Sequence, residues 1–140
     1  MNSKLFKDSR LAIFTDGGSR GNPGPAAIGV VVGNKKYGEY IGETTNNVAE
    51  YAAVLFALKK AKSLLGKKKA KETDLGVNVD SELIAKQLNA EYKIKNENLF
   101  PFFIKIWNLR QDFNSVTFKH ILRDKNKEAD RLVNEALDNI

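Results

Sequence analysis

The stretch Leu11-Ala12-Ile13-Phe14-Thr15-Asp16-Gly17-Gly18 decides how the rest of the chain can fold. Apolar residues followed by Asp-Gly-Gly are typical of a buried strand that ends at Asp16 and runs into a loop. The next stretch, Gly21-Asn22-Pro23-Gly24-Pro25, has a composition that excludes a helix or a central strand, so we expect an ordered turn there. The chain therefore starts with one strand that leads into a turn.

Two further strands are predicted directly after this turn. Residues 26–32 are almost entirely apolar, residues 37–43 alternate in polarity, and Gly33-Asn34 between them is typical of a hairpin turn. Three strands joined by short turns imply an antiparallel meander.

After the meander, the spacing of apolar residues changes to that of a helix. Asn46 or Asn47 can cap this helix, Gly66 stops it, and Ser81 is placed to cap a later one. The remaining expected elements are a strand at 75–79, helices at 82–89 and 98–112, a strand at 116–120 and a helix at 127–137. Trp107 follows the apolar pattern of its helix, and we expect it in the core.

These elements predict an α/β fold with the order β-β-β-α-β-α-α-β-α, in which helices cover both faces of a five-stranded mixed sheet. The chain has 140 residues, which is a common size for one domain. We therefore expect a single domain over residues 1–140, with residues 1–9 as a short flexible N-terminal extension.

The composition excludes several kinds of chemistry. The chain has no Cys and one His, which excludes thiol nucleophiles, iron–sulfur clusters and any site that needs two imidazoles. Carboxylates, hydroxyls, amides and an acquired metal ion remain. The net charge of +6 is compatible with an anionic partner. No apolar segment approaches the ~20 residues that span a bilayer, and no signal peptide is recognisable, so we expect a cytoplasmic protein without a membrane partner.

Four carboxylates lie where strands end or helices begin. Asp16 closes the first expected strand, Asp80 closes the fourth, and Glu50 and Asp130 lie near the starts of two helices. Each has an ordinary explanation, such as a turn, a helix cap or a favourable helix dipole. Ligands of mixed α/β sheets bind beyond the carboxyl ends of central strands, however, so the set together predicts a functional site.

The sequence around these carboxylates resembles the four signature blocks of type 1 ribonuclease H. The blocks fall in the family's order between about Leu11 and Leu137. They are Thr15-Asp16-Gly17-Gly18-Ser19 with the following Gly21-Asn22-Pro23-Gly24-Pro25, Thr44-Thr45-Asn46-Asn47-Val48-Ala49-Glu50, Val79-Asp80-Ser81 and Asn126-Lys127-Glu128-Ala129-Asp130.

The resemblance implies a ribonuclease H fold and an endonuclease that hydrolyses the RNA strand of RNA–DNA hybrids. It assigns catalysis and the binding of two Mg²⁺ ions, or Mn²⁺, to Asp16, Glu50, Asp80 and Asp130. Two such ions can activate a water and stabilise the leaving oxygen of a phosphodiester. Mg²⁺ prefers oxygen ligands, which suits a carboxylate set. Without metal, four close carboxylates repel one another, and we expect at least one raised pKa.

The resemblance also assigns substrate contacts and an auxiliary residue. The implied substrate contacts are Asn22, Thr45, Asn46, Asn47 and Ser81. Amides and hydroxyls can bind a 2′-hydroxyl, a base edge or a phosphate. The resemblance assigns an auxiliary role in catalysis to either His120 or Arg123, because the sequence from Phe118 to Arg123 resembles the family branch with a His-Val-Pro-Arg stretch. Arg123 can contact phosphate but cannot act as a base.

Two alternatives to a hybrid-specific nuclease remain at this point. One is a catalytically silent nucleic-acid-binding module on the same fold, although clustered negative charge would not help such a binder. The other is a related metal nuclease that prefers double-stranded RNA or structured DNA. We expect a monomer whose partner is an RNA–DNA hybrid.

The densest basic segment runs from Lys59 to Lys71 and has two interpretations. It is either a solvated helix end or a phosphate-binding surface. We favour the solvated end, because Glu50 places the predicted site at the opposite end of the same helix.

Overall fold

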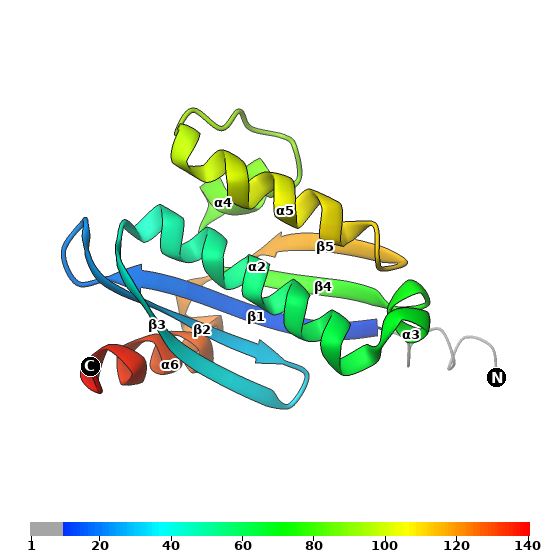
Figure 1. Cartoon of the computed structure of the whole chain (residues 1–140), viewed down its shortest axis with the longest axis horizontal. Helices are drawn as coiled ribbons and strands as arrows, with labels where there is room; N and C mark the ends of the chain where they lie inside the picture. Colours follow the sequence, from blue (N-terminus) through cyan, green and yellow to red (C-terminus); the bar gives the residue numbers. More distant parts are fainter. Residues whose placement is uncertain (1–9) are drawn as a thin grey trace.

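A computed structural model describes residues 10–140, and the expected N-terminal extension at residues 1–9 lies outside the described residues. Its centre is a five-stranded sheet in the order β3-β2-β1-β4-β5 (Figure 1). The strands are β1 (Arg10–Ser19), β2 (Gly24–Val32), β3 (Lys35–Thr44), β4 (Asp74–Val79) and β5 (Ser115–His120). The helices are α2 (Asn46–Leu65), α3 (Lys67–Lys71), α4 (Glu82–Leu88), α5 (Phe100–Arg110) and α6 (Lys127–Asp138), with short 3-10 turns η1 (Glu97–Leu99) and η2 (Arg123–Lys125).

The sheet is mixed, as the sequence predicts. β1 pairs antiparallel with β2, which pairs antiparallel with β3, and these three strands form the expected meander. β4 pairs parallel with both β1 and β5. Because Thr15 of β1 lies opposite Val79 of β4, the next residue along each strand, Asp16 and Asp80, lies at the same edge of the sheet.

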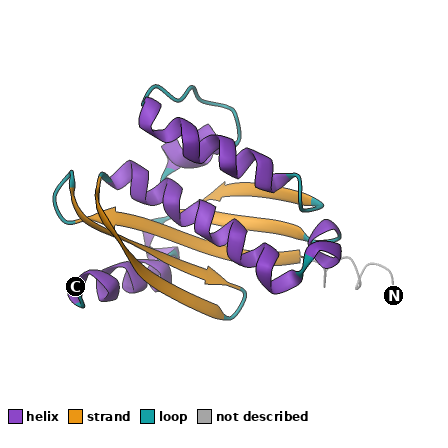
Figure 2. Ribbon diagram, viewed as in Figure 1, coloured by secondary structure: helices purple, strands orange, loops and turns teal. Residues whose placement is uncertain are grey.

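Helices cover both faces of the sheet, which confirms the expected layers (Figure 2). Alternate strand residues explain this arrangement, because neighbours along a strand point to opposite faces. Ile28 of β2 belongs to the main core beneath α2, whereas the adjacent Ala27 packs with Val133 and Leu137 of α6. Within residues 10–140, no helix has the length and apolar character needed to cross a membrane.

Two glycines allow these helices to touch the sheet backbone. A Cβ on Gly17 would lie 2.3 Å from the carbonyl of Ala49 in α2, and a Cβ on Gly29 would lie 2.1 Å from the carbonyl of Ala129 in α6. Real Cβ atoms essentially never come this close, so only glycine fits at either place. The contacts bring α2 and α6 to the middle strands, close to β1.

Three expectations about the elements are wrong. β1 does not end at Asp16 but continues to Ser19, because Gly17 pairs with β2 beneath α2 instead of starting a loop. A short extra helix, α3, follows Gly66, so the order along the chain has one more helix than predicted. Trp107 is 47% exposed on α5 instead of buried, since its ring stacks on the surface with Phe103.

Candidate active site

The four predicted carboxylates line one cavity of about 490 Å³ at the edge of the sheet. Asp16 comes from β1, Asp80 follows β4 directly, Glu50 lies one turn into α2, and Asp130 lies in the first turn of α6. Gly17 explains how Glu50 reaches Asp16, because the absence of a Cβ lets the α2 backbone at Ala49 and Glu50 occupy the space where that Cβ would lie. The fold therefore gathers residues that lie far apart in the sequence.

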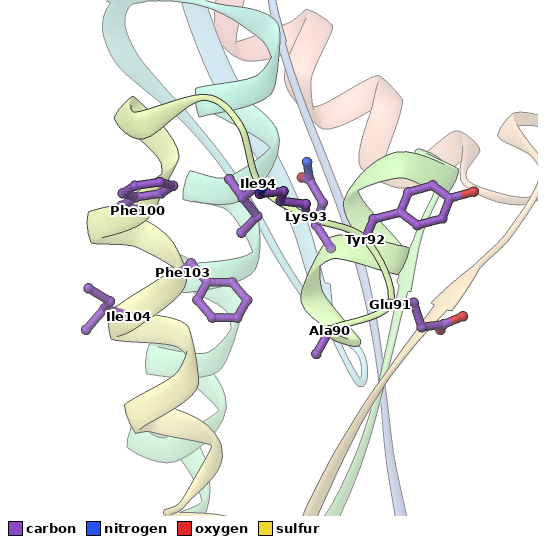
Figure 3. Close-up of a pocket in the computed structure, with 9 residues that line it drawn as sticks. Ala90, Glu91, Tyr92, Lys93, Ile94, Phe100, Phe103 and Ile104 are labelled. Atoms are coloured by element: carbon purple, nitrogen blue, oxygen red, sulfur yellow. The ribbon is translucent and has the colours of Figure 1, made fainter.

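A second cavity, of about 530 Å³, is different in character. It lies between α5 and the loop that follows α4, and its walls include Tyr92, Ile94, Phe100 and Phe103 (Figure 3). Its walls are mainly apolar, and none of the four carboxylates lines it. The acidic cavity is therefore the candidate site for chemistry that uses carboxylates.

Burial and mutual repulsion make two of the carboxylates difficult to ionise. The pKa of Asp16 is raised to about 8, first by burial and then by the nearby charges of Asp80, Asp130 and Glu50. The pKa of Glu50 is raised to about 7 by burial and by Asp80, against a lowering by Ser81 and Arg123. Repulsion raises both pKa values as expected, but the loss of solvent is the larger cause.

The donor set suits a hard divalent cation. Within residues 10–140, no three acidic or histidine side chains are already arranged as a closed metal cage. Mg²⁺ does not need one, because it keeps several waters and is usually held by one or two carboxylates plus phosphate oxygens. Buried carboxylates that repel one another would be relieved by a cation between them, so these residues fit the ion.

Two asparagine side chains are connected by hydrogen bonds near the acidic cavity: Asn46 lines this cavity, whereas Asn22 is not among its lining residues and contacts Asn46. The Oδ1 atom of Asn46 accepts hydrogen bonds from the backbone N–H and the hydroxyl of Ser19, at 2.8 and 3.1 Å. The Oδ1 atom of Asn22 accepts from the backbone N–H of Asn46 at 3.0 Å. Both amides thus use their oxygen within the protein, which leaves their NH₂ groups as the available donors.

Thr45 and Ser81 have a structural task in addition to any contact with substrate. The Thr45 hydroxyl accepts from Val48 N and caps α2, and the Ser81 hydroxyl accepts from Ile84 N and caps α4. The prediction that Asn46 or Asn47 caps the first helix is therefore wrong, because both already lie inside it. Asn46 and Asn47 instead line the acidic cavity.

The structure separates the two candidates for the auxiliary role. Arg123 lines the cavity together with the four carboxylates, and its charge acts on Glu50. His120 ends β5, is exposed and is not among the residues that line the cavity. Sequence spacing alone does not distinguish them, because the short loop and 3-10 turn after β5 decide which side chain reaches the carboxylates.

One contact at the site was not predicted. Asn126, immediately before α6, is 1% exposed and donates through Nδ2 to the Asp80 carboxylate at 3.1 Å. Its place in the block Asn126-Lys127-Glu128-Ala129-Asp130 was a usable signal, but nothing in that pattern indicates that Asn126 and Asp80 meet.

Sheet order and acidic cavity together define the ribonuclease H-like class of fold. Residues 14–136 match the family described as reverse transcriptase-like. The chain is 35% identical over 138 residues to ribonuclease HI of Halobacterium salinarum, covering 94% of this chain and 66% of that protein. The chain therefore belongs to the ribonuclease H-like, reverse transcriptase-like family.

Further relatives and solved structures are similar to this chain. The bifunctional protein Rv2228c of Mycobacterium tuberculosis is 35% identical over 92% of this chain, and the chain spans only 36% of that protein's length. The crystal structure of LC11-RNase H1 in complex with an RNA/DNA hybrid is 46% identical, with a TM-score of 0.86 over 92% of this chain and 97% of that one. RNase H1 of Halobacterium salinarum superposes with a TM-score of 0.85.

Proposed function

We propose that this chain is an endoribonuclease that hydrolyses the RNA strand of RNA–DNA hybrids with the help of two divalent metal ions. The main support is the gathering of Asp16, Glu50, Asp80 and Asp130 around one cavity. The similarity to LC11-RNase H1, whose structure contains an RNA/DNA hybrid, supports the choice of substrate. We take residues 1–140 to act as one domain, as a monomer and in the cytoplasm.

The four carboxylates would hold two Mg²⁺ ions, for which Mn²⁺ could substitute. When bound, such ions supply an activated water and stabilise the 3′-oxygen that leaves. The protein contributes a cavity in which Asp16 and Glu50 are hard to ionise without a cation. Asp16 and Glu50 would therefore give up their protons in order to serve as anionic oxygen ligands of such a cation.

The neighbouring amides would distinguish RNA from DNA. Because the oxygens of Asn22 and Asn46 are occupied within the protein, their NH₂ groups can donate to a ribose 2′-hydroxyl or to acceptors on base edges in the minor groove. Asn47 lies in the same cavity wall as Asn46. Thr45 and Ser81 fix the starts of the two helices that carry this surface, and their hydroxyls complete the proposed set of contacts.

Arg123 would take the auxiliary role in preference to His120. Its guanidinium can donate to a phosphate oxygen near the carboxylates, but it remains protonated and cannot accept a proton from water. We assign it the task of orienting the phosphate, and we assign no proton transfer to His120.

A cleavage assay tests the proposal. Labelled RNA–DNA, RNA–RNA and DNA–DNA duplexes of one sequence are incubated with the protein, with and without Mg²⁺. We expect cutting of the RNA strand in the hybrid only, and only with metal. Equal cutting of all three duplexes would indicate a nuclease of different preference, and binding without cutting would indicate the silent module.

The variant Asn46→Asp tests whether this amide contacts the substrate. It keeps the oxygen that accepts from Ser19, replaces the NH₂ donor with a second oxygen and adds a negative charge to the acidic cavity, so kcat is measured beside KM. Loss of this donor should raise KM for the hybrid by about tenfold, the size expected for one hydrogen bond to a polar substrate. Ser19→Ala is the matched control, because it removes one internal bond and leaves the Asn46 donor in place.

A further inference from the structure

Asn126 is one of the few polar residues in the interior of the described chain, with 1% of its surface exposed. Its Nδ2 atom donates to the backbone carbonyl of Thr15 at 2.8 Å and to Oδ2 of Asp80 at 3.1 Å. Since both partners can only accept, the orientation of the amide is fixed. The NH₂ group therefore has no freedom to turn away from Asp80.

These bonds connect the elements that carry three of the four carboxylates. Thr15 directly precedes Asp16 on β1, and Asp80 follows β4. The backbone carbonyl of Asn126 also accepts a hydrogen bond from the backbone N–H of Asp130 at 3.1 Å. This bond joins Asn126 to the first turn of α6. A single residue thus contacts β1, the end of β4 and the start of α6.

The stability of the fold alone does not explain why residue 126 has an amide side chain. Within the described part of the chain, the Oδ1 atom of Asn126 is the one buried side-chain polar atom that has no hydrogen-bond partner. Leaving a buried acceptor unpaired is costly, and an apolar side chain of the same shape would avoid that cost. The useful part of the side chain is therefore the Nδ2 group and its two bonds.

We propose that Asn126 is a positioning residue that holds the Asp80 carboxylate in the orientation needed to bind a divalent cation. The inference rests on the proposed function of the four carboxylates. Asn126 binds one oxygen of Asp80, which restricts rotation of the carboxylate and leaves its other oxygen for the cation. Hydrogen bonds of this kind orient metal ligands in proteins, and their removal typically costs metal affinity.

The variant Asn126→Leu tests this role, because Leu has nearly the same shape but no donor and no unpaired acceptor. Binding of Mn²⁺ to the protein without nucleic acid is measured by titration calorimetry and by the metal-dependent rise in unfolding temperature. We expect a half-saturating Mn²⁺ concentration about tenfold or more above that of the unmodified protein. The unfolding temperature without metal should fall modestly, because Leu removes two hydrogen bonds and the donor to the buried Thr15 carbonyl, while removal of the unpaired oxygen offsets only part of that loss.

Gln87→Leu provides a matched control for the loss of a buried amide. Gln87 is 6% exposed, and its Oε1 accepts from the Tyr51 hydroxyl instead of meeting a carboxylate. This variant should bind Mn²⁺ as the unmodified protein does. In an Asp80→Asn background, Asn126→Leu should cause no further loss of affinity, because the residue through which it acts is already changed.

A second replacement keeps the inference testable if Asn126→Leu does not fold. Asn126→Ser retains a hydroxyl donor, although one bond nearer the backbone than Nδ2, and should have an intermediate Mn²⁺ affinity. If the unmodified protein binds Mn²⁺ and cuts hybrid, while every folded Asn126 variant has the same half-saturation, the positioning role is wrong. If the unmodified protein neither binds Mn²⁺ nor cuts hybrid, it is the proposed function that fails.

Discussion

The two ends of helix α2 carry opposite charge in very different surroundings. Near its start, Glu50 lies in the acidic cavity, and burial and Asp80 raise its pKa to about 7. Near its end, Lys62 forms an ion pair with Asp112 at 2.8 Å while both side chains stay more than a third exposed. Glu50 and Lys62 are 12 residues apart in the helix, which separates them by about 18 Å along its axis.

The difference shows which charges carry information about function. Exposed cations that pair with a carboxylate or lie over a ring, as Lys60 does at 5.1 Å from the Tyr37 centroid, are satisfied within the protein. The buried carboxylates near the helix start face further negative charge instead. Buried negative charge that costs stability therefore indicates a functional task, whereas the partners of Lys60 and Lys62 favour an ordinary solvated surface at the basic end.

The substitution Asp16→Asn should have the largest effect on cleavage. It replaces a carboxylate that we propose binds metal with a neutral amide. We therefore expect a fall of about a thousandfold or more in kcat with Mg²⁺. Hybrid binding, measured by fluorescence anisotropy, should persist. Asp112→Asn is the matched control, because it makes the same chemical change at the basic end and should leave kcat within about twofold.

A catalytic loss in Asp112→Asn that equals the loss in Asp16→Asn would contradict the distinction between the two ends. It would mean that removal of a carboxylate near either end of α2 disturbs cleavage through the fold.

The substitution Arg123→Ala should have the next largest effect on cleavage, and His120→Ala should have little effect. Arg123→Ala should slow cleavage by about ten- to a hundredfold, because it removes a cationic side chain that lines the cavity and acts on Glu50. His120→Ala should remain within about twofold of the unmodified rate, since His120 does not line the cavity. Single-turnover rates on the hybrid measure both, and a slow His120→Ala with a normal Arg123→Ala would reverse the assignment.

The metal-free protein should lose stability as the pH rises from about 4 to about 8. The pKa of Asp16 is raised from 3.8 to about 8 and that of Glu50 from 4.5 to about 7. Above about pH 4 the unfolded chain releases these protons while the folded chain keeps them, so rising pH favours unfolding until about pH 8. Urea unfolding in chelator over this range measures the slope.

Asp16→Asn should flatten this slope and raise the free energy of unfolding at about pH 8, because the buried acid is gone. Asp112→Asn should keep the slope of the unmodified protein. A metal-free stability that increases between about pH 5 and about pH 8 would contradict the environment found for Asp16.

Most of the fold could be predicted from the sequence, because strand and helix periods are local properties. The role of Gly17 could not, since the apolar pattern gives no sign that α2 lies directly on β1, and Asp-Gly-Gly is usual for a turn. Trp107 follows a helical apolar spacing, yet its ring stays half exposed on α5. Periodicity identifies an apolar face and does not identify its partner.

The candidate site could likewise be predicted only in part. The proximity of Asp16 and Asp80 was predictable, because parallel strands end at one edge of a sheet. The contact between Asn126 and Asp80 joins residues 46 positions apart through an amide, and no sequence pattern encodes it. The choice between His120 and Arg123 depends on the path of the chain after β5, which a small difference in the turn would change.

The smallest effect is expected at the basic end, from a triple change of Lys67, Lys68 and Lys69 to Gln. These residues lie in α3, beyond the end of α2 that is opposite Glu50. If they are a solvated surface, KM for the hybrid and its dependence on salt should stay within about twofold of the unmodified protein. If they bind the phosphates of a long hybrid, the slope of log affinity against log salt should instead fall by about 0.9 for each phosphate that one of these lysines neutralises. Comparing a short hybrid with one long enough to reach α3 separates these outcomes, because only the long hybrid can bring phosphates to the three lysines.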